Sequence, residues 1–116
     1  MRFRLTAALL ALAVACVTAA AALARPAATY QVNVTIRDTS CKLARTSVSK
    51  KNTKIVFHLI NDGKVAHGFK VGGKTSPMVK PASSADLVVN FGKSGMYPYT
   101  CTGGAAKKGV FTIRTT

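Results

Sequence analysis

Glutamate and tryptophan are both absent from this chain of 116 residues, and only Asp38, Asp62 and Asp86 carry negative charge. The 17 lysines and arginines therefore leave a formal net charge of +14. A chain with so few carboxylates, and with no nucleophile in a recognisable turn, offers neither an acid/base pair nor a catalytic triad. We expect a protein that is not an enzyme.

Long apolar runs are also missing, except at the N-terminus. A basic opening is followed by an apolar run from Leu5 to about Val17, and Ala22-Leu23-Ala24 has the small residues of a cleavage site. This order is typical of a secretory signal. The pattern predicts a signal peptide over residues 1–24 and an exported domain over residues 25–116.

The apolar run is too short for a transmembrane span, which needs about 20 residues. Lipid attachment at Cys16 is an alternative that the sequence favours less, because Ala13 stands where a lipoprotein signal normally has leucine. We therefore expect a monomer in the periplasm, the cell envelope or the extracellular space, with no transmembrane segment once the signal is removed.

Helical periodicity is not found in the exported part, which instead alternates between apolar and polar residues. Turn signals rich in Gly, Asn, Asp and Ser separate the alternating segments. The predicted strands are Tyr30–Ile36, an irregular strand through Cys41, Leu43 and Val48, Lys54–Ile60, His67–Val71, Ala85–Phe91, Met96–Cys101 and Gly109–Arg114. About seven short strands in one small domain predict an all-β, antiparallel Greek-key β-sandwich.

The positive charge is scattered through turns and strands as single lysines and arginines. Without a clustered basic helix, and with export expected, nucleic acid is not a predicted partner. The surplus either keeps the protein soluble or attracts an anionic partner, such as an envelope polymer, lipid headgroups or an acidic protein.

Two stretches of the sequence resemble the cupredoxin family of small blue-copper proteins. The first is Met96–Ile113, in which Cys101 ends an aromatic strand just before a glycine turn, and the second is Val65–Val71 around His67. The resemblance extends roughly from Tyr30 to Arg114. It implies a cupredoxin-like β-sandwich in which Cys101 and His67 match the cysteine and the first histidine of a type 1 copper site.

The resemblance fails in the loop after Cys101, where the family has a second histidine and a methionine. Those ligands would fall near Gly104 and near Lys107 or Lys108. Trigonal copper sites need two imidazoles and a thiolate, so no resident cofactor is expected, with copper as the alternative. His58, the only other histidine, is interpreted as a strand residue with a local hydrogen bond, and the methionines Met78 and Met96 as core filler.

The family arrangement implies that Cys41 lies beside the final strands, at the end of the sandwich where the metal is held. We therefore predict a disulfide between Cys41 and Cys101, with two free thiols, or a metal bound through His67 and Cys101, as the alternatives. In the disulfide reading, His67 hydrogen-bonds to backbone and stays partly exposed to solvent. In the metal reading, His67 and Cys101 bind Cu(I) or Zn(II) weakly.

These observations predict an exported cupredoxin-like domain with a degenerate copper site, which acts as a non-enzymatic binding or structural module. The alternative is a copper-binding electron-transfer or copper-handling protein that uses His67 and Cys101.

Overall fold

The computed structural model describes residues 29–104 and 106–116, so the predicted signal peptide and Cys16 lie outside the described residues. No helix that could cross a membrane occurs in these residues. The nine strands are β1 (Tyr30–Ile36), β2 (Cys41–Leu43), β3 (Ser47–Ser49), β4 (Lys54–Asn61), β5 (Gly68–Val71), β6 (Lys74–Thr75), β7 (Ser84–Asn90), β8 (Gly95–Thr102) and β9 (Lys107–Arg114).

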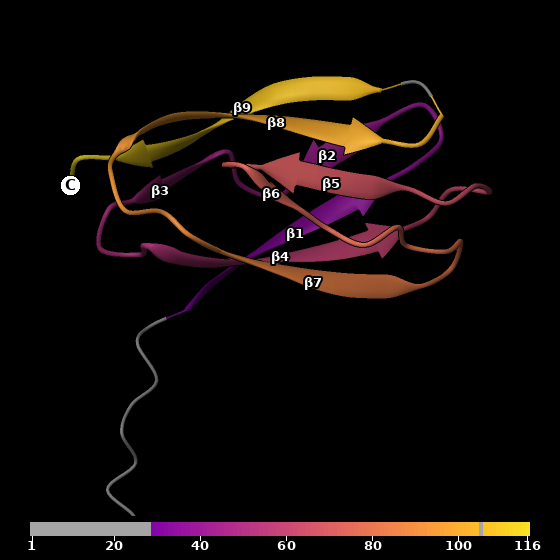
Figure 1. The fold of residues 1–116 in the computed structure, drawn as a ribbon, viewed down its shortest axis with the longest axis horizontal. Coiled ribbons are helices and arrows are strands. Elements are labelled where there is room, and N and C mark those ends of the chain that lie inside the picture. The colour runs from indigo at the N-terminus through magenta and orange to yellow at the C-terminus, as the bar shows by residue number, and fades with distance from the viewer. Residues whose placement is uncertain (1–28, 105) are drawn as a thin grey trace, which may run out of the picture.

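The strands form two stacked sheets (Figure 1). One sheet has the order β2-β1-β4-β7 and the other has the order β3-β9-β8-β5-β6. The predicted all-β sandwich is confirmed, but the sheets are mixed, because β1 pairs with β4 and β3 pairs with β9 in parallel. Alternation reports which residues face the core and carries no information on strand direction, so these two parallel pairs were not predicted.

The predicted second strand is in fact two strands that belong to different sheets. Residues Cys41–Leu43 pair with β1, whereas Ser47–Ser49 cross to the other sheet and pair with β9. The irregular apolar spacing of this segment reflects the crossing. The two-residue β6 forms the outer edge of its sheet. Its position agrees with the prolines that follow it, because proline lacks the donor that a central strand requires.

The core lies between the sheets and is built around Phe57 on β4. The ring of Phe57 lies 5.2 Å from that of Phe69, 5.2 Å from that of Phe111 and 6.3 Å from that of Phe91. The opposite face of β4 is only half-buried, because it forms part of the outer surface of the four-stranded sheet. The nearly continuous apolar run of this strand therefore does not mean that both of its faces are covered.

Truncating the central ring tests this description of the core. Phe57→Ala should lower the free energy of unfolding by about 3 to 5 kcal/mol, because it removes a fully buried ring and leaves a cavity among three others. Val88→Ala is the matched control: Val88 is 46% exposed on the outer face of β7 and its loss should cost no more than about 0.5 kcal/mol. Urea unfolding of both variants checks the prediction, and equal losses would contradict it.

Candidate functional site: the His67 end of the sandwich

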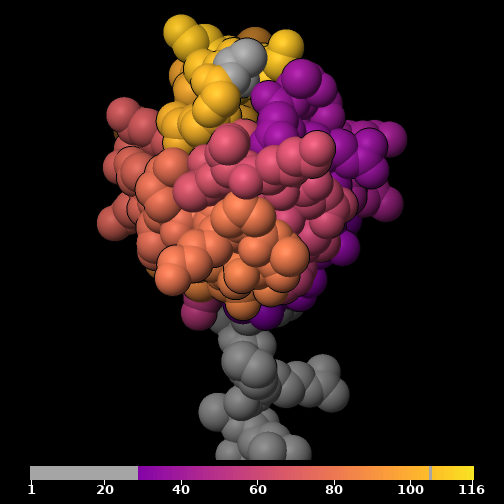
Figure 2. Space-filling model, turned by 90° about the vertical axis from the view of Figure 1, so that its right-hand side faces the viewer, coloured from indigo at the N-terminus to yellow at the C-terminus, as the bar shows by residue number. Residues whose placement is uncertain are grey.

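The residues that the sequence singled out meet at one end of the sandwich. Figure 2 shows this end, with the β4–β5 connection (pink) near the centre, the β1–β2 connection (indigo) and the β8–β9 connection (yellow) above it, and the β6–β7 connection (orange) below. His67 lies at the end of the β4–β5 connection and forms an isolated bridge with Val79 of the β6–β7 connection. Four segments that are distant in sequence thus meet at the end of the sandwich that holds His67.

The structure joins Cys41 to Cys101, with their Cα atoms 6.4 Å apart. This separation lies within the range of about 4.4 to 6.8 Å that a disulfide allows. Cys41 begins β2 of the four-stranded sheet and Cys101 lies on β8 of the five-stranded sheet. The bridge therefore links the two sheets covalently, at the end of the molecule that holds His67.

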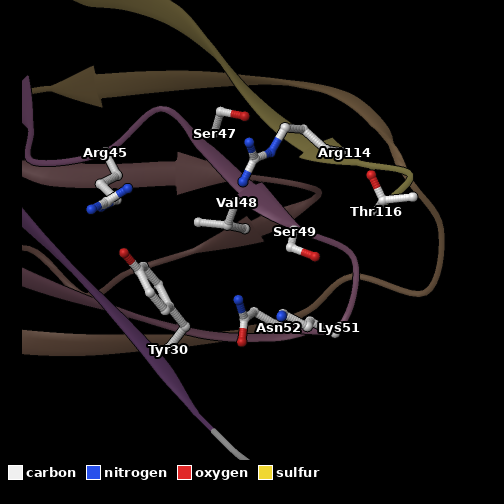
Figure 3. A pocket seen from close by; sticks show the side chains of 9 residues that line it. All are labelled: Tyr30, Arg45, Ser47, Val48, Ser49, Lys51, Asn52, Arg114 and Thr116. Carbon is white, nitrogen blue, oxygen red and sulfur yellow. The ribbon is translucent and has the colours of Figure 1, made fainter.

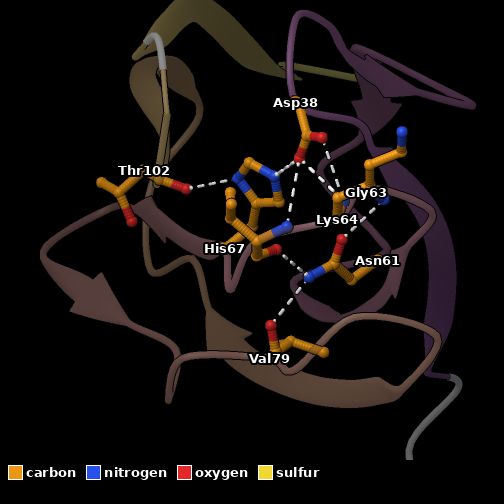
Figure 4. A network of polar contacts seen from close by, with 8 residues as sticks. Asp38, Asn61, Gly63, Lys64, His67, Val79 and Thr102 are labelled. Carbon is orange, nitrogen blue, oxygen red and sulfur yellow. Dashed lines mark hydrogen bonds and ion pairs between the residues drawn. The ribbon is translucent and has the colours of Figure 1, made fainter.

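His67 is almost fully buried, with 1% of the residue exposed. Its Nδ1 lies 3.0 Å from the carbonyl oxygen of Thr102, and its Nε2 lies 2.9 Å from Oδ1 of Asp38 (Figure 4). We expected a partly exposed ring that hydrogen-bonds to backbone. The exposure was wrong, because the ring is buried, and the side-chain partner Asp38 was not foreseen. The β1–β2 connection, which carries Asp38, and the end of β8, which carries Thr102, cover the ring on both sides.

Both partners of the His67 ring can only accept hydrogen bonds, since one is a carbonyl and the other an ionised carboxylate. A neutral imidazole has one N–H and can satisfy only one of them, whereas an imidazolium satisfies both. Burial lowers the pKa of His67, but the hydrogen bonds to Asp38 and Thr102 outweigh it, so the pKa is raised above its ordinary value of 6.5. The geometry therefore favours a protonated His67.

Asp38 is held in place by backbone as well as by His67. Its Oδ1 and Oδ2 each accept a hydrogen bond from the amide of Lys64, at 3.0 Å, and Oδ1 also accepts one from the amide of Val65, at 3.4 Å. The hydrogen bond from His67, followed by that from Lys64, lowers the pKa of Asp38 below its ordinary value of 3.8. The carboxylate is thus positioned as an anion by three groups of the β4–β5 connection.

Asn61 organises the connection that leads to His67. Its buried side-chain amide donates to the carbonyl oxygens of Val65, at 2.9 Å, and Val79, at 2.8 Å. Its side-chain oxygen accepts a hydrogen bond from the amide of Gly63, at 2.8 Å. The loop therefore has a defined shape, and the bridge to the Val79 segment closes it from below.

Two glycines allow the chain to approach the His67 ring closely. A Cβ atom at Gly63 would collide with Oδ1 of Asp38 and lie 2.8 Å from Nε2 of His67. A Cβ atom at Gly103 would collide with the carbonyl oxygen of Ala66 and lie 2.8 Å from Nδ1 of His67. Gly103 also has a φ of +89°, which side chains other than glycine rarely adopt.

Sequence reasoning missed Asp38 and Asn61, which the structure brings to His67. The available signals were weak: Asp38 lies in a polar break between strands, and Asn61 opens a turn of the type Asn-Asp-Gly. Both features normally mark turns. Only the three-dimensional arrangement shows that these turns meet.

The remaining candidates lie elsewhere or take other roles. His58 on β4 pairs with Asp86 on β7, with Nδ1 2.6 Å from Oδ1, which matches the expected local hydrogen bond. Met78 and Met96 are 57% and 73% exposed. The interpretation of both as core filler was wrong, because Met78 lies in the β6–β7 connection and Met96 projects from the open face of β8.

The donor atoms at this end do not fit a type 1 copper ion, which takes two imidazoles and a thiolate. The sulfur of Cys101 is bonded to Cys41, and both ring nitrogens of His67 are directed at acceptors. In residues 29–104 and 106–116, no three His, Cys, Asp or Glu side chains lie close enough to hold a metal ion.

Comparison with known proteins identifies the fold. The sequence profile of the family described as "Cupredoxin-like domain" matches residues 6–113. Dithionite-reduced auracyanin from the photosynthetic bacterium Roseiflexus castenholzii is 15% identical, with a TM-score of 0.57 over 77% of this chain and 99% of that one. Auracyanin B is 19% identical, with a TM-score of 0.54 over 73% and 88%.

A heme-copper terminal oxidase dimer is also similar, at 16% identity, with a TM-score of 0.59 over 79% of this chain and 68% of that one. No curated protein sequence matches the chain. At these identities, the solved structures establish the shared fold alone.

The His67–Asp38 pair predicts a characteristic dependence of stability on pH. The raised pKa of His67 gives a stabilisation that is complete below pH 6.5 and is lost as pH rises through the raised value. The lowered pKa of Asp38 gives a second stabilisation, which is complete above pH 3.8 and is lost as pH falls through the lowered value. The pair should therefore stabilise the fold most between pH 3.8 and pH 6.5.

Asp38→Asn tests this dependence, because the substitution removes the charge and keeps a side-chain oxygen as acceptor. We expect the loss of stability relative to the wild type to be greatest between pH 5 and pH 6, and to shrink at alkaline pH where His67 is neutral. Asp62→Asn is the control, because Asp62 is exposed and makes the same change in net charge. Urea unfolding across this pH range measures the free energy of unfolding of each variant. Parallel pH profiles of that free energy for Asp38→Asn and the wild type would contradict the pairing.

Proposed function

We propose the following role for this chain, which belongs to the family of cupredoxin-like domains: it is a non-enzymatic binding or structural module that works in an exported compartment without copper. The observation that carries the proposal is the disulfide between Cys41 and Cys101. Copper in this fold is ligated by a thiolate, and a sulfur shared in a disulfide is not one.

The two hydrogen-bond acceptors that face the His67 ring support the same proposal. Metal ligation needs the lone pair of a neutral imidazole nitrogen. The acceptors Asp38 and Thr102 favour a proton on both nitrogens. For copper to bind here, a separate reductant would first have to cleave the disulfide, and the ion would then have to displace a proton that two hydrogen bonds stabilise.

The non-enzymatic part of the proposal rests on the two histidine–aspartate pairs. Asp38 and His67 are occupied in holding the β1–β2 connection, the β4–β5 connection and the end of β8 together. His58 and Asp86 face each other across neighbouring strands on an open sheet surface. Within the described residues, neither pair has a nucleophilic side chain in hydrogen-bonding distance, so neither forms a triad.

Export is supported by the signal-like N-terminal pattern and by a disulfide, which persists in oxidising compartments. The net charge of +14 supports an anionic partner, such as an envelope component or an acidic protein. A monomer that displays a basic surface on a rigid sandwich is suited to such a partner.

The second candidate function is copper handling or electron transfer. It is favoured by the positions of His67 and Cys101, which match the ligands of the family, and by structural neighbours that include a heme-copper terminal oxidase. It requires a reduced Cys101.

Thiol counting and copper addition separate the two functions. In a Cys16→Ala background, the denatured, unreduced protein should contain no titratable thiol, and two should appear after reduction. Copper added to the native, unreduced protein should give no blue colour. Two thiols before reduction, together with stoichiometric copper that is lost in His67→Ala, would establish the copper function instead.

Cys41→Ala measures the structural value of the bridge in the same background. The disulfide closes a loop with a sequence separation of 60, for which chain entropy predicts roughly 4 kcal/mol of stabilisation. We expect urea unfolding to show a loss of that size under non-reducing conditions, and a much smaller difference from the parent when both proteins are reduced. A loss that persists under reduction would point to packing at Cys41 rather than to the bridge.

A further inference from the structure

An open cavity of about 300 Å³ lies at the end of the sandwich opposite His67. Its location follows from Arg114, which lines the cavity at the end of β9. Strand β9 begins opposite Cys101 and finishes at the far end of the molecule (Figure 1). The cavity is lined by Tyr30, Arg45, Ser47, Val48, Ser49, Lys51, Asn52, Arg114 and Thr116 (Figure 3).

Three cationic side chains from separate segments line this cavity. Arg45 belongs to the β2–β3 connection, Lys51 to the turn after β3, and Arg114 to the end of β9. Figure 3 shows Arg45 and Arg114 on either side of Val48, which is buried. No acidic side chain lines the cavity, and none of the three cations forms an ion pair with a carboxylate of the described residues. Their positive charges are therefore available to an anionic ligand.

Neutral hydrogen-bond donors accompany the three cations. Ser49 is directly in register with Arg114 across the parallel β3–β9 pair, and only 9% of it is exposed. No side-chain hydrogen bond of Ser49 occurs among residues 29–104 and 106–116. The hydroxyl of Ser47 and the amide of Asn52 also line the cavity. The cavity thus combines positive charge with small donors on a β-sheet framework.

We propose that this cavity binds a phosphate group. Arginine forks bind phosphate oxygens through two parallel hydrogen bonds, and such charge-assisted bonds are about twice as strong as neutral ones. Two arginines, a lysine and nearby hydroxyls supply more donors than a planar carboxylate with two oxygens can use, whereas a tetrahedral phosphate can engage them. The inference deepens the proposed binding role and rests on it, because it gives the anionic partner a chemical class and a place on the fold.

Titration with inorganic phosphate at constant ionic strength tests the site, with amide chemical shifts as the readout. We expect saturable shifts centred on Ser47, Ser49, Asn52 and Arg114. Arg45→Gln/Arg114→Gln should weaken binding at least tenfold, because it removes both forks. Both arginines are exposed, and the spectrum of the variant itself reports whether it is folded. The single substitutions, each expected to weaken binding by a smaller factor, serve if the double variant does not fold.

The matched control removes two charges from a different cavity. Arg37 and Lys42, with Thr35 and Ser40, line a second cavity of about 290 Å³. Arg37→Gln/Lys42→Gln should leave phosphate affinity within twofold of the wild type. Equal losses in the two double variants, shifts centred on the second cavity, or no saturable shift at all would overturn the proposal.

Vesicles distinguish a lipid headgroup from a soluble phosphate as the source of the ligand. If the headgroup is bound, the protein should sediment with phosphatidylglycerol vesicles and not with phosphatidylcholine vesicles. Arg45→Gln/Arg114→Gln should reduce the fraction of protein that sediments more than the control double variant does. If inorganic phosphate binds in the cavity and the vesicles do not, the ligand is a soluble or polymeric phosphate. Vesicle binding that both double variants weaken equally, and that about 1 M salt removes, would retain the anionic partner but overturn the cavity as its site.

Discussion

The hydrogen bonds of the buried His67 ring are the constraint on which one end of this molecule depends. A buried charge is tolerated only when it is paired and hydrogen-bonded. His67 meets this condition through Asp38 on one side and the carbonyl of Thr102 on the other. Asp38 in turn requires the amides of Lys64 and Val65. The hydrogen bonds of one imidazole thus fix the positions of the β1–β2 connection, the β4–β5 connection and the end of β8.

In a type 1 copper site the metal ion holds separate segments of the chain together. In this protein the disulfide and the hydrogen bonds of His67 hold them together instead. A bound ion would tie a cysteine and two imidazoles from different loops together. Here the bridge between Cys41 and Cys101 ties the two sheets covalently. When protonated, which its raised pKa favours, His67 carries a positive charge that faces Asp38 and Thr102. Glycine at position 103 keeps the β8–β9 connection close enough for this contact.

The strands could largely be predicted, because the alternation of apolar and polar residues within each segment indicates them. The strands β1, β4 and β7 alternate or run apolar over their full length, and the structure places them close to the expected bounds. The parallel pairing of β1 with β4 and the crossing of β3 to the second sheet could not be predicted in this way. Both depend on contacts between segments distant in sequence, whose direction alternation does not encode.

The site was predicted in part and for a different reason. His67, Cys41 and Cys101 were found through the resemblance to a family, and they do lie at one end of the sandwich. Asp38 was not found, because an aspartate in a polar break is ordinary turn chemistry. The basic cavity was equally hidden, since Arg45, Lys51 and Arg114 are single cations in a chain that is basic throughout.

The protonation state of His67 tests the central claim most directly. Ring nitrogen chemical shifts, followed by NMR from pH 5 to pH 9, report whether each nitrogen of His67 carries a proton. The account predicts that both do so below and through pH 6.5, with a midpoint above that value, and that Asp38→Asn lowers the midpoint. A neutral ring with one bare nitrogen at pH 6.5, unchanged in Asp38→Asn, would contradict it.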